Sequence, residues 1–182
     1  FGWVSKIAFK AGTQHVFTLG DDRTGSLLDR AVHHSDRHQT VSRQADDLAA
    51  ILYTSGTTGR SKGAMLSHGN LLAGAQALVE AWEWTPADRL LHALPMFHMH
   101  GLGAGINGSL TAGASMVVLP RFAPQAVVEA VAAYGATMFF AVPTMYALLR
   151  DADALPGLRG LRLLVSGSAP LDPVLFADVE AV

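Results

Sequence analysis

The sequence contains no cysteine, which excludes a disulfide framework and a thiolate metal site. It also lacks an excess of basic residues, because 13 Lys and Arg residues stand against 15 Asp and Glu residues. This balance argues against a protein that binds the phosphate backbone of nucleic acids. No apolar run reaches the roughly 18–20 residues that cross a bilayer, and no signal-peptide pattern opens the chain. These absences favour a cytoplasmic protein with no membrane span and no nucleic-acid partner.

What remains is a chain of 182 residues that is half apolar and only 15% charged. That composition is sufficient for the core of one domain or of a large piece of a domain. The chain opens with FGWVSK, without an initiator methionine, and closes with DPVLFADVEAV inside a predicted helix that has no stop signal. We therefore expect an internal fragment of a longer protein.

Apolar strand patterns alternate with helix patterns through most of the chain. Strands are predicted in DRLLHALP, SMVVLP, ATMFFAV and GLRGLRLLVSG, and helices over 101–112, 124–134 and 143–150. Apolar strands separated by helices indicate β-α-β units. The predicted fold class is α/β, with a mostly parallel sheet flanked by helices.

The first part of the chain is less regular. We expect a short strand from His15 to Leu19, a short helix from residue 26 and a polar linker that ends at residue 47. Residues 1–47 would thus end a preceding α/β segment, and residues 48–182 would form the second portion. LAAILY (48–53) is predicted to be a buried strand, and Ser67 is predicted to cap the helix that follows.

Between the strand predicted at 48–53 and Ser67, TSGTTGRSKG (54–63) has no apolar side chain. Glycines let backbone N–H groups approach a phosphate, hydroxyls add donors, and a lysine adds a cation. A solvent-exposed connection is the alternative, although ordinary connections are shorter, at about 2–6 residues. A Walker A loop is excluded, because that pattern requires Gly before the lysine and Ser or Thr after it, whereas Ser61 and Gly63 flank Lys62.

YTSGTTGRSKGAMLSHGNL resembles the phosphate loop of the adenylate-forming enzymes, which include acyl-CoA synthetases, luciferases and the adenylation domains of peptide synthetases. Ser61 stands where that family usually has proline. LPMFHMHG, FFAVPTMYALL and LRLLVSGSAPL resemble three further segments of the family, in the same order. The resemblance implies a fragment of the large N-terminal domain of such an enzyme.

The resemblance also implies the site residues. A phosphate loop would hold ATP and Mg²⁺, with Thr54 or Thr57 nearest the metal, and Lys62 and His98 would be catalytic. The remaining positions implied for the loop are Ser55, Gly56, Thr58 and Gly59, and those implied for the substrate and adenine pocket are His98, Ser166, Gly167, Ser168, Ala169 and Pro170.

The implied reaction begins when a substrate carboxylate attacks the α-phosphate of ATP and pyrophosphate leaves. The thiol of coenzyme A then attacks the acyl-adenylate and releases AMP. LHALPMFHMHGL and LRLLVSGSAPL are most similar to the malonyl-CoA synthetases within the family, which makes malonate the expected small acid.

Because the second carboxylate of malonate must be matched inside the pocket, we expect Arg162 to anchor it. The alternative for Arg162 is a surface position beside a strand. Gly103 and Gly105 are expected to widen the pocket.

Other functions remain open. They are a medium- or long-chain fatty acid–CoA ligase, an adenylation domain that loads a carrier protein, and a non-catalytic nucleotide-binding module. GAGING (103–108) fits a Gly-x-Gly-x-x-Gly pattern but does not directly follow the predicted strand, which argues against dinucleotide binding. His98 and His100 lack a third zinc ligand nearby in the sequence. We expect the isolated 182-residue piece to be inactive.

Overall fold

The computed structural model describes residues 2–54 and 61–182, and the chain divides into two compact units, Phe1–Ser42 and Arg43–Val182. The division lies a few residues before the boundary expected at residue 47. Residues 43–47 belong to the larger unit because the carbonyls of Ala45 and Asp47 accept hydrogen bonds from the backbone N–H groups of Gly69 and His68 at 2.7 and 3.0 Å. None of the described helices is long and apolar enough to span a membrane.

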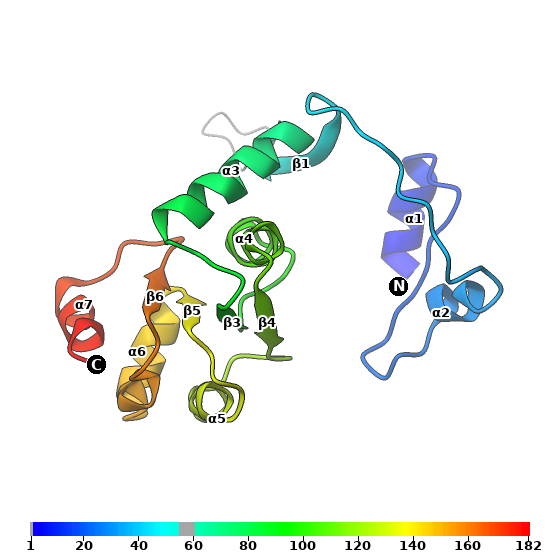
Figure 1. The fold of residues 1–182 in the computed structure, drawn as a ribbon. Helices are drawn as coiled ribbons and strands as arrows, with labels where there is room; N and C mark the ends of the chain where they lie inside the picture. Colours follow the sequence, from blue (N-terminus) through cyan, green and yellow to red (C-terminus); the bar gives the residue numbers. More distant parts are fainter. Residues whose placement is uncertain (1, 55–60) are drawn as a thin grey trace. The chain divides into compact units, whose positions relative to one another are not determined.

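The smaller unit contains two helices, α1 (Gly2–Lys10) and α2 (Ser26–Ala31) (Figure 1). The strand predicted from His15 to Leu19 is wrong, since these residues adopt no regular secondary structure. An extended segment needs a neighbouring strand for its backbone hydrogen bonds, and no other strand is described in this unit. Instead, Thr18 bonds to the residues that open α2, with its backbone N–H 3.0 Å from Oγ of Ser26.

The larger unit is built on a four-stranded parallel sheet, which confirms the predicted α/β class. The strand order is β4 (Ser115–Val118), β3 (Arg89–His92), β5 (Met138–Ala141) and β6 (Leu163–Ser166). Each strand falls within a segment that the sequence predicts as a strand. Because all four run in the same direction, their carboxyl ends meet at one edge of the sheet.

Helices cover both faces of this sheet (Figure 1). A π-helix, η1 (His100–Ile106), and α4 (Asn107–Ala112) join β3 to β4 on one face, whereas α5 (Pro124–Tyr134) and α6 (Pro143–Asp151) lie on the other. The chain leaves β3 in one direction along the sheet and later proceeds to β5 and β6 in the other, and right-handed crossovers then place the helices on opposite faces. A 3₁₀ turn, η2 (Leu155–Leu158), precedes β6, and α7 (Pro173–Glu180) follows it.

A separate antiparallel hairpin precedes the sheet. It pairs β1 (Leu48–Thr54) with β2 (Lys62–Ser67) and leads directly into α3 (His68–Ala81). Ser67 caps α3 as predicted, since its Oγ accepts from the N–H of Asn70 while the Asn70 side chain accepts from the N–H of Ser67. The prediction that β1 is buried is wrong. Most of its residues are exposed, because a two-stranded hairpin offers no second layer to cover both faces.

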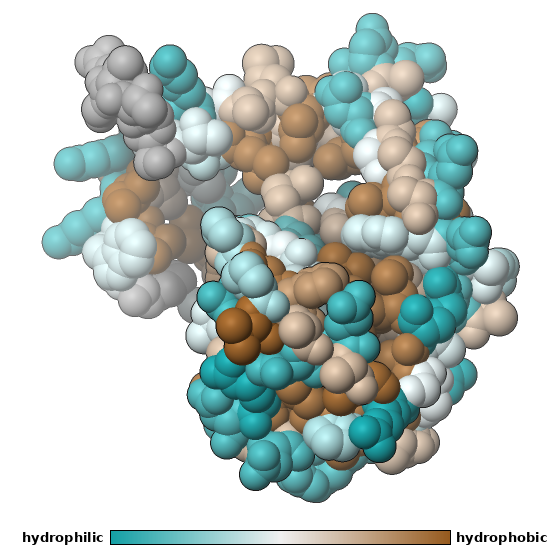
Figure 2. All heavy atoms as spheres, turned by 90° about the vertical axis from the view of Figure 1, so that its left-hand side faces the viewer, coloured by the Kyte–Doolittle hydropathy of each residue, from teal (hydrophilic) through white to brown (hydrophobic). Residues whose placement is uncertain are grey.

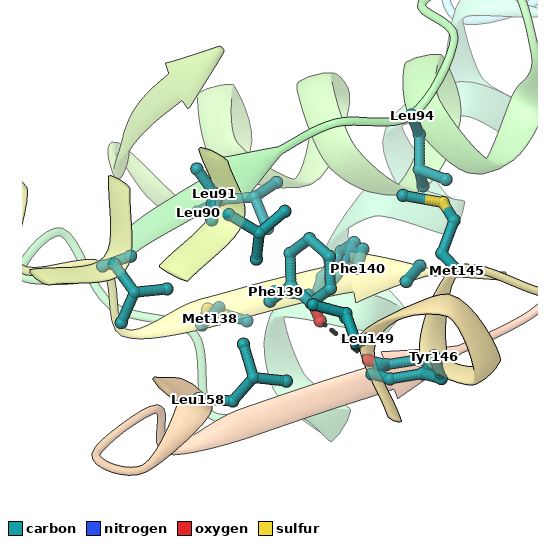
Figure 3. Close-up of a cluster of buried hydrophobic side chains, with 14 of the residues drawn as sticks. Leu90, Leu91, Leu94, Met138, Phe139, Phe140, Met145, Tyr146, Leu149 and Leu158 are labelled. Atoms are coloured by element: carbon teal, nitrogen blue, oxygen red, sulfur yellow. Dashed lines mark hydrogen bonds between the residues drawn. The ribbon is translucent and has the colours of Figure 1, made fainter. Parts of the chain in front are cut away.

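The hydrophobic core lies on both faces of the sheet, against α5 and α6 on one face and against α4 and Trp84 on the other, and Figure 3 shows part of it. Tyr146 on α6 is buried, and its hydroxyl donates to the carbonyls of Val165 at 3.1 Å and Phe139 at 3.4 Å, which ties the helix to two strands. Burial raises the pKa of the Tyr146 hydroxyl, so it remains a donor. The fully buried side chains of the sheet come from β3 and β5 and are Leu90, Leu91, His92, Met138, Phe139, Phe140 and Ala141.

The sheet ends at β6, and the face beyond it is apolar. Hydrophobic side chains gather on the side of the molecule that carries α7 (Figure 2), where Val174 and Phe176 are exposed. Side chains of this kind normally mark a surface that another element covers. No element of the described chain covers this one.

At the edge of the sheet where the strands begin, here called the amino edge, one buried carboxylate connects three strands. Asp88, just before β3, accepts hydrogen bonds from Arg162 at 2.6 and 2.7 Å, from the Thr137 hydroxyl at 2.8 Å and from the backbone N–H of Thr85 at 2.8 Å. Thr137 precedes β5 and Arg162 precedes β6. The Arg162 guanidinium, followed by the other donors, holds the pKa of Asp88 far below its usual range against the opposing effect of burial.

Replacing Asp88 by asparagine should destabilise the protein at neutral pH, because Arg162 and Thr137 lose their charged acceptor. We expect the free energy of unfolding to fall by about 1–3 kcal/mol, with the lower end reflecting the solvent-accessible side of Arg162. The Asp88 pKa is lowered on folding, so its contribution is complete above the unfolded value of about 3.9 and is lost as the pH falls below it.

Urea unfolding of wild type and Asp88→Asn at pH 7 and pH 3 measures this difference, which should shrink at the lower pH. In the same assay, Arg162→Met should lose stability, and the double variant should lose less than the sum of the single losses. Wild-type stability of Asp88→Asn at pH 7 would contradict the role assigned to this network.

Candidate active site

The carboxyl edge of the sheet carries a cavity of about 620 Å³. In open parallel sheets, ligands bind outside the carboxyl ends of the strands, where neighbouring strands send their connections to opposite faces. Here that point lies between β3, which leads to η1, and β5, which leads to α6. The cavity is lined by segments that follow β3, β4, β5 and β6, namely Ala93, Leu94, Pro95, Phe97, His98, His100, Gly101, Leu119, Pro120, Arg121, Phe122, Val142, Met145 and Ser168.

Two histidines and one serine supply polar atoms to this cavity. The backbone N–H of His100 donates to Nδ1 of His98 at 3.3 Å, and Oγ of Ser168 lies 3.4 Å from Nδ1 of His100. The His100 ring stacks on Phe140 with centroids 6.1 Å apart. The structure thus brings together two segments that the sequence predicts to share a site, the one after β3 and the one after β6.

The turn after β6 is shaped to approach His100 closely. Ser168 has φ of 71°, a left-handed conformation that is uncommon for a residue with a side chain. At Gly167, an added Cβ would lie 2.8 Å from Cε1 of His100, which is too close for any side chain without a shift. Backbone strain of this kind is often found at functional sites.

The cavity environment favours uncharged His100. Burial lowers the pKa of His100, and the neighbouring His98 lowers it further. In its neutral form the ring can serve as a hydrogen-bond donor and acceptor. His98 accepts at Nδ1, so a neutral His98 carries its proton on Nε2 and can donate that proton to a ligand oxygen.

Arg162 lies at the other end of β6 from this cavity, and the prediction that it anchors a substrate carboxylate is not supported. Its guanidinium is held by Asp88 and by the carbonyls of Trp82 and Glu83 at 3.0 and 3.3 Å. The Asp88 carboxylate at the amino edge of the sheet balances the positive charge of Arg162, and the two carbonyls accept further hydrogen bonds from its guanidinium. Arg162 is therefore a structural residue.

The predicted Ser166–Pro170 segment is divided by the fold. Ser168 lines the large cavity, but Ser166 and Ala169 line a different one, of about 360 Å³, between β6 and α7. Pro170 is exposed and is not among the residues that line either cavity. Successive residues of an extended turn point in different directions, so a continuous motif does not imply a single pocket.

Thr54 and Lys62 flank the Gly/Thr loop. They pair across the end of the β1–β2 hairpin, where the Thr54 hydroxyl donates to the Lys62 carbonyl at 3.5 Å, and both residues are exposed. The other predicted loop residues, Ser55, Gly56, Thr57, Thr58 and Gly59, lie outside the described residues.

Three polar residues at or near the cavity were not predicted as substrate-binding residues. His100, which the sequence offered only as a weak zinc-ligand candidate, lines the cavity. Arg121 lines it from the segment after β4, and His92, the last residue of β3, is buried behind it. The position of Arg121 could have been predicted from the sequence. An arginine that follows a predicted strand of a parallel sheet should lie at the carboxyl edge, where ligands bind. The burial of His92 has no signal in the sequence, because a histidine at a strand end is compatible with either environment.

Close contacts with neighbouring groups explain two glycines of η1. A Cβ at Gly105 would lie 2.8 Å from the His92 ring, and one at Gly101 would lie 2.3 Å from the carbonyl oxygen of Pro95. Gly105 thus makes room for His92 and does not widen a ligand pocket, contrary to expectation. Gly103 does line a second cavity of about 390 Å³, beside Met99. Since GAGING lies within η1 and α4, it does not form the strand-to-helix loop of a dinucleotide site.

The family model of AMP-binding enzymes matches residues 6–182. The chain belongs to the AMP-binding enzyme family. The mitochondrial malonate–CoA ligase ACSF3 of Mus musculus is 38% identical over 166 residues, which cover 79% of this chain and 28% of the mouse protein.

Solved structures of this family share the fold. ATP-bound MatB from Rhodopseudomonas palustris superimposes with a TM-score of 0.88 at 47% identity, covering 98% of this chain and 35% of MatB. A malonyl-CoA ligase in a product complex with methylmalonyl-CoA and AMP gives a TM-score of 0.71 at 41% identity, covering 79% of this chain and 32% of the ligase. The chain therefore spans about a third or less of each of these proteins. A protein of their length that carries this chain is called the full-length protein below.

Gly167→Ala should displace the His100 ring. Carbon atoms in contact prefer separations of about 3.5–4.0 Å, so the added methyl, 2.8 Å from Cε1, should move the ring by about 0.7 Å or more. A crystal structure of the variant measures the movement. In a His100→Ala background the same substitution should cost little stability, and an unmoved His100 in the single variant would contradict the close approach described above.

His92→Leu should reduce the loss of stability on acidification. Burial lowers the pKa of His92, so below about pH 6.5 the unfolded chain binds a proton that the folded chain does not. Stability supported by neutral His92 is therefore present above pH 6.5 and declines as the pH falls. From pH 7.5 to 5 the free energy of unfolding, measured with urea, should fall more for wild type than for His92→Leu, and equal losses in the two proteins would contradict this assignment.

Proposed function

We propose that the full-length protein is an ATP-dependent acid–CoA ligase that activates a small carboxylic acid, with malonate as the favoured substrate. The observation that carries this proposal is the cavity at the carboxyl edge, where His98, His100 and Ser168 converge in a fold shared with ATP-bound MatB. The names of the mouse enzyme and of the malonyl-CoA ligase in complex with methylmalonyl-CoA support the choice of acid and of acceptor.

The phosphate loop would bind ATP. Lys62 and the hydroxyls of the loop would neutralise the β- and γ-phosphates, whose charge grows as pyrophosphate leaves. Mg²⁺ fits the Thr54 end of this loop, since the hydroxyl there donates its proton to a carbonyl and keeps oxygen lone pairs for a hard cation. Thr57 is the other candidate. When bound, Mg²⁺ would offset phosphate charge.

At the cavity, the histidines would position the acid. His98, with Nε2–H available, would donate to an oxygen of the carboxylate or of the adenylate. The apolar wall formed by Leu94, Val142 and Met145 would exclude water from the mixed anhydride before the thiol arrives. The new bond joins the carboxylate oxygen to the α-phosphorus, and the bond from that phosphorus to pyrophosphate breaks.

A longer acid is the second candidate substrate. The cavity beside Met99 is lined mainly by apolar residues of α3, η1 and α4, and such a surface suits a hydrocarbon chain. A carrier protein that bears the same thiol arm as coenzyme A is the alternative acceptor. The location in the cytoplasm also remains a prediction, and the mitochondrial name of the mouse relative provides the alternative.

Lys62→Ala and Thr57→Ala test the phosphate-binding role in the full-length protein. Each should remove about 2–4 kcal/mol of transition-state stabilisation from adenylate formation, the size expected for one electrostatic donor. Malonate-dependent exchange of pyrophosphate into ATP measures this step without coenzyme A, and melting temperatures should remain near the wild-type value. Lys6→Ala, on the exposed surface of α1, is the matched control. Full exchange in both loop variants would refute the proposal.

A further inference from the structure

A small dicarboxylic acid has two carboxylates, and only one of them reacts with ATP. The carboxylate that attacks ATP becomes part of the mixed anhydride, whereas the second carboxylate remains ionised throughout. A carboxylate moved from water into a largely apolar cavity without a partner is costly. A ligase that prefers malonate to a monocarboxylic acid of similar size therefore needs a cation within reach of the distal end of its substrate.

The cavity offers few groups for this purpose. Arg162 is engaged by Asp88 at the far end of β6. Burial favours the neutral form of His100, so it provides hydrogen bonds without a full charge. Among the described residues that line the cavity, Arg121 is the one lysine or arginine, and none is acidic.

The guanidinium of Arg121 is also available to bind a ligand. Its guanidinium forms no hydrogen bond or ion pair with any described residue, unlike Arg89, Arg150 and Arg162, which each bind a neighbouring acceptor. An exposed arginine without an internal partner keeps both prongs of its guanidinium for a ligand. This planar group binds a carboxylate through two parallel hydrogen bonds.

The backbone that carries Arg121 is held in place by the core. The N–H of Leu119 donates to the carbonyl of His92 at 2.9 Å, which continues the β3–β4 pairing beyond the end of β4. Leu119 and Phe122 pack against the hydrophobic core on either side of Arg121. Only this short connection separates β4 from α5 at Pro124, so the position of Arg121 at the cavity is set before a ligand binds.

We propose that Arg121 selects dicarboxylic acids by pairing with the carboxylate that is not activated. This inference rests on the proposed acid–CoA ligase function and names the specificity-determining residue of that site. Arg121 lies on the segment after β4, and His98 and Ser168 lie on segments after β3 and β6, so one acid would be held between the guanidinium at one end and the hydrogen-bonding groups of His98 and Ser168 at the other.

The test uses the full-length protein with Arg121→Met, which keeps much of the length of the side chain but removes its charge, and Arg121→Lys, which keeps the charge but loses the fork. Arg159→Met is the matched control, since Arg159 is exposed and lines none of the cavities described above. Pyrophosphate exchange is measured with malonate, methylmalonate, acetate and butanoate, and the KM for coenzyme A is measured in the complete reaction.

With Arg121→Met, kcat/KM for malonate and methylmalonate should fall by about ten- to a hundredfold, the range for one charged hydrogen-bonding pair. Values for acetate and butanoate should change less than about twofold, and Arg121→Lys should fall between wild type and Arg121→Met. Arg159→Met should match wild type for every acid. The KM for coenzyme A should be unchanged in all variants.

Three results would overturn the inference and leave the proposed function intact: an equal loss with all four acids, an unchanged malonate value, or a raised KM for coenzyme A alone. The last would assign Arg121 to a phosphate of the thiol substrate. A wild-type protein that exchanges pyrophosphate with none of the acids would instead refute the proposed function, and the inference with it.

Discussion

The carboxylate of Asp88 is the constraint on which the arrangement of the site depends. It receives hydrogen bonds from Thr85, from Thr137 before β5 and from Arg162 before β6, so the amino ends of three strands are fixed to one buried charge. Parallel pairing then carries this alignment along each strand, and His92, Phe140 and Val165 lie level across β3, β5 and β6 near the carboxyl edge. The residues of the cavity follow directly after these positions. We therefore expect removal of the charge at the amino edge to shift the strand ends that position the cavity residues.

The strands and helices after residue 88 were predictable because neighbouring elements cover them. The apolar residues of each element therefore recur with the period of a strand or of a helix. The same logic fails for β1, where the run 48–53 forms a strand that stays mostly exposed, since an apolar pattern does not reveal what covers it. It also fails for the form of η1. A helix over 101–112 was predicted, but its π-turns accompany the close packing of Gly105 on His92 and of Gly101 on the Pro95 carbonyl, which are tertiary contacts.

For the site, the predicted residues His98 and Ser168 line one cavity, and their binding roles remain predictions. The prediction failed at Arg162 because nearness in sequence was taken for nearness in space. Arg162 and Ser166 lie at opposite ends of one strand, and at about 3.3 Å per residue they are separated by roughly 13 Å. Asp88, the partner of Arg162, is 74 residues away in the sequence, and no local sequence pattern predicts this pairing. Arg121 was not predicted because it is distant in sequence from the other cavity residues. It follows β4, whereas His98 and Ser168 follow β3 and β6.

The β1–β2 hairpin, which flanks the proposed phosphate loop, and the cavity at the carboxyl edge belong to different parts of the larger unit, and α3 lies between them in the chain. Its first residue follows β2, which begins with Lys62, and the helix ends beside Trp82, whose ring packs edge-on against Phe140 at 5.0 Å. Phe140 in turn stacks on His100. A rigid helix thus runs from the lysine-bearing hairpin to the aromatic ring beneath the site histidine. Transfer from ATP to an acid requires the α-phosphate and the carboxylate to meet within about 3–3.5 Å. In the proposed reaction, that distance would depend on how α3 packs, so we expect substitutions at the Trp82–Phe140 contact to alter the reaction rate although neither residue lines the cavity.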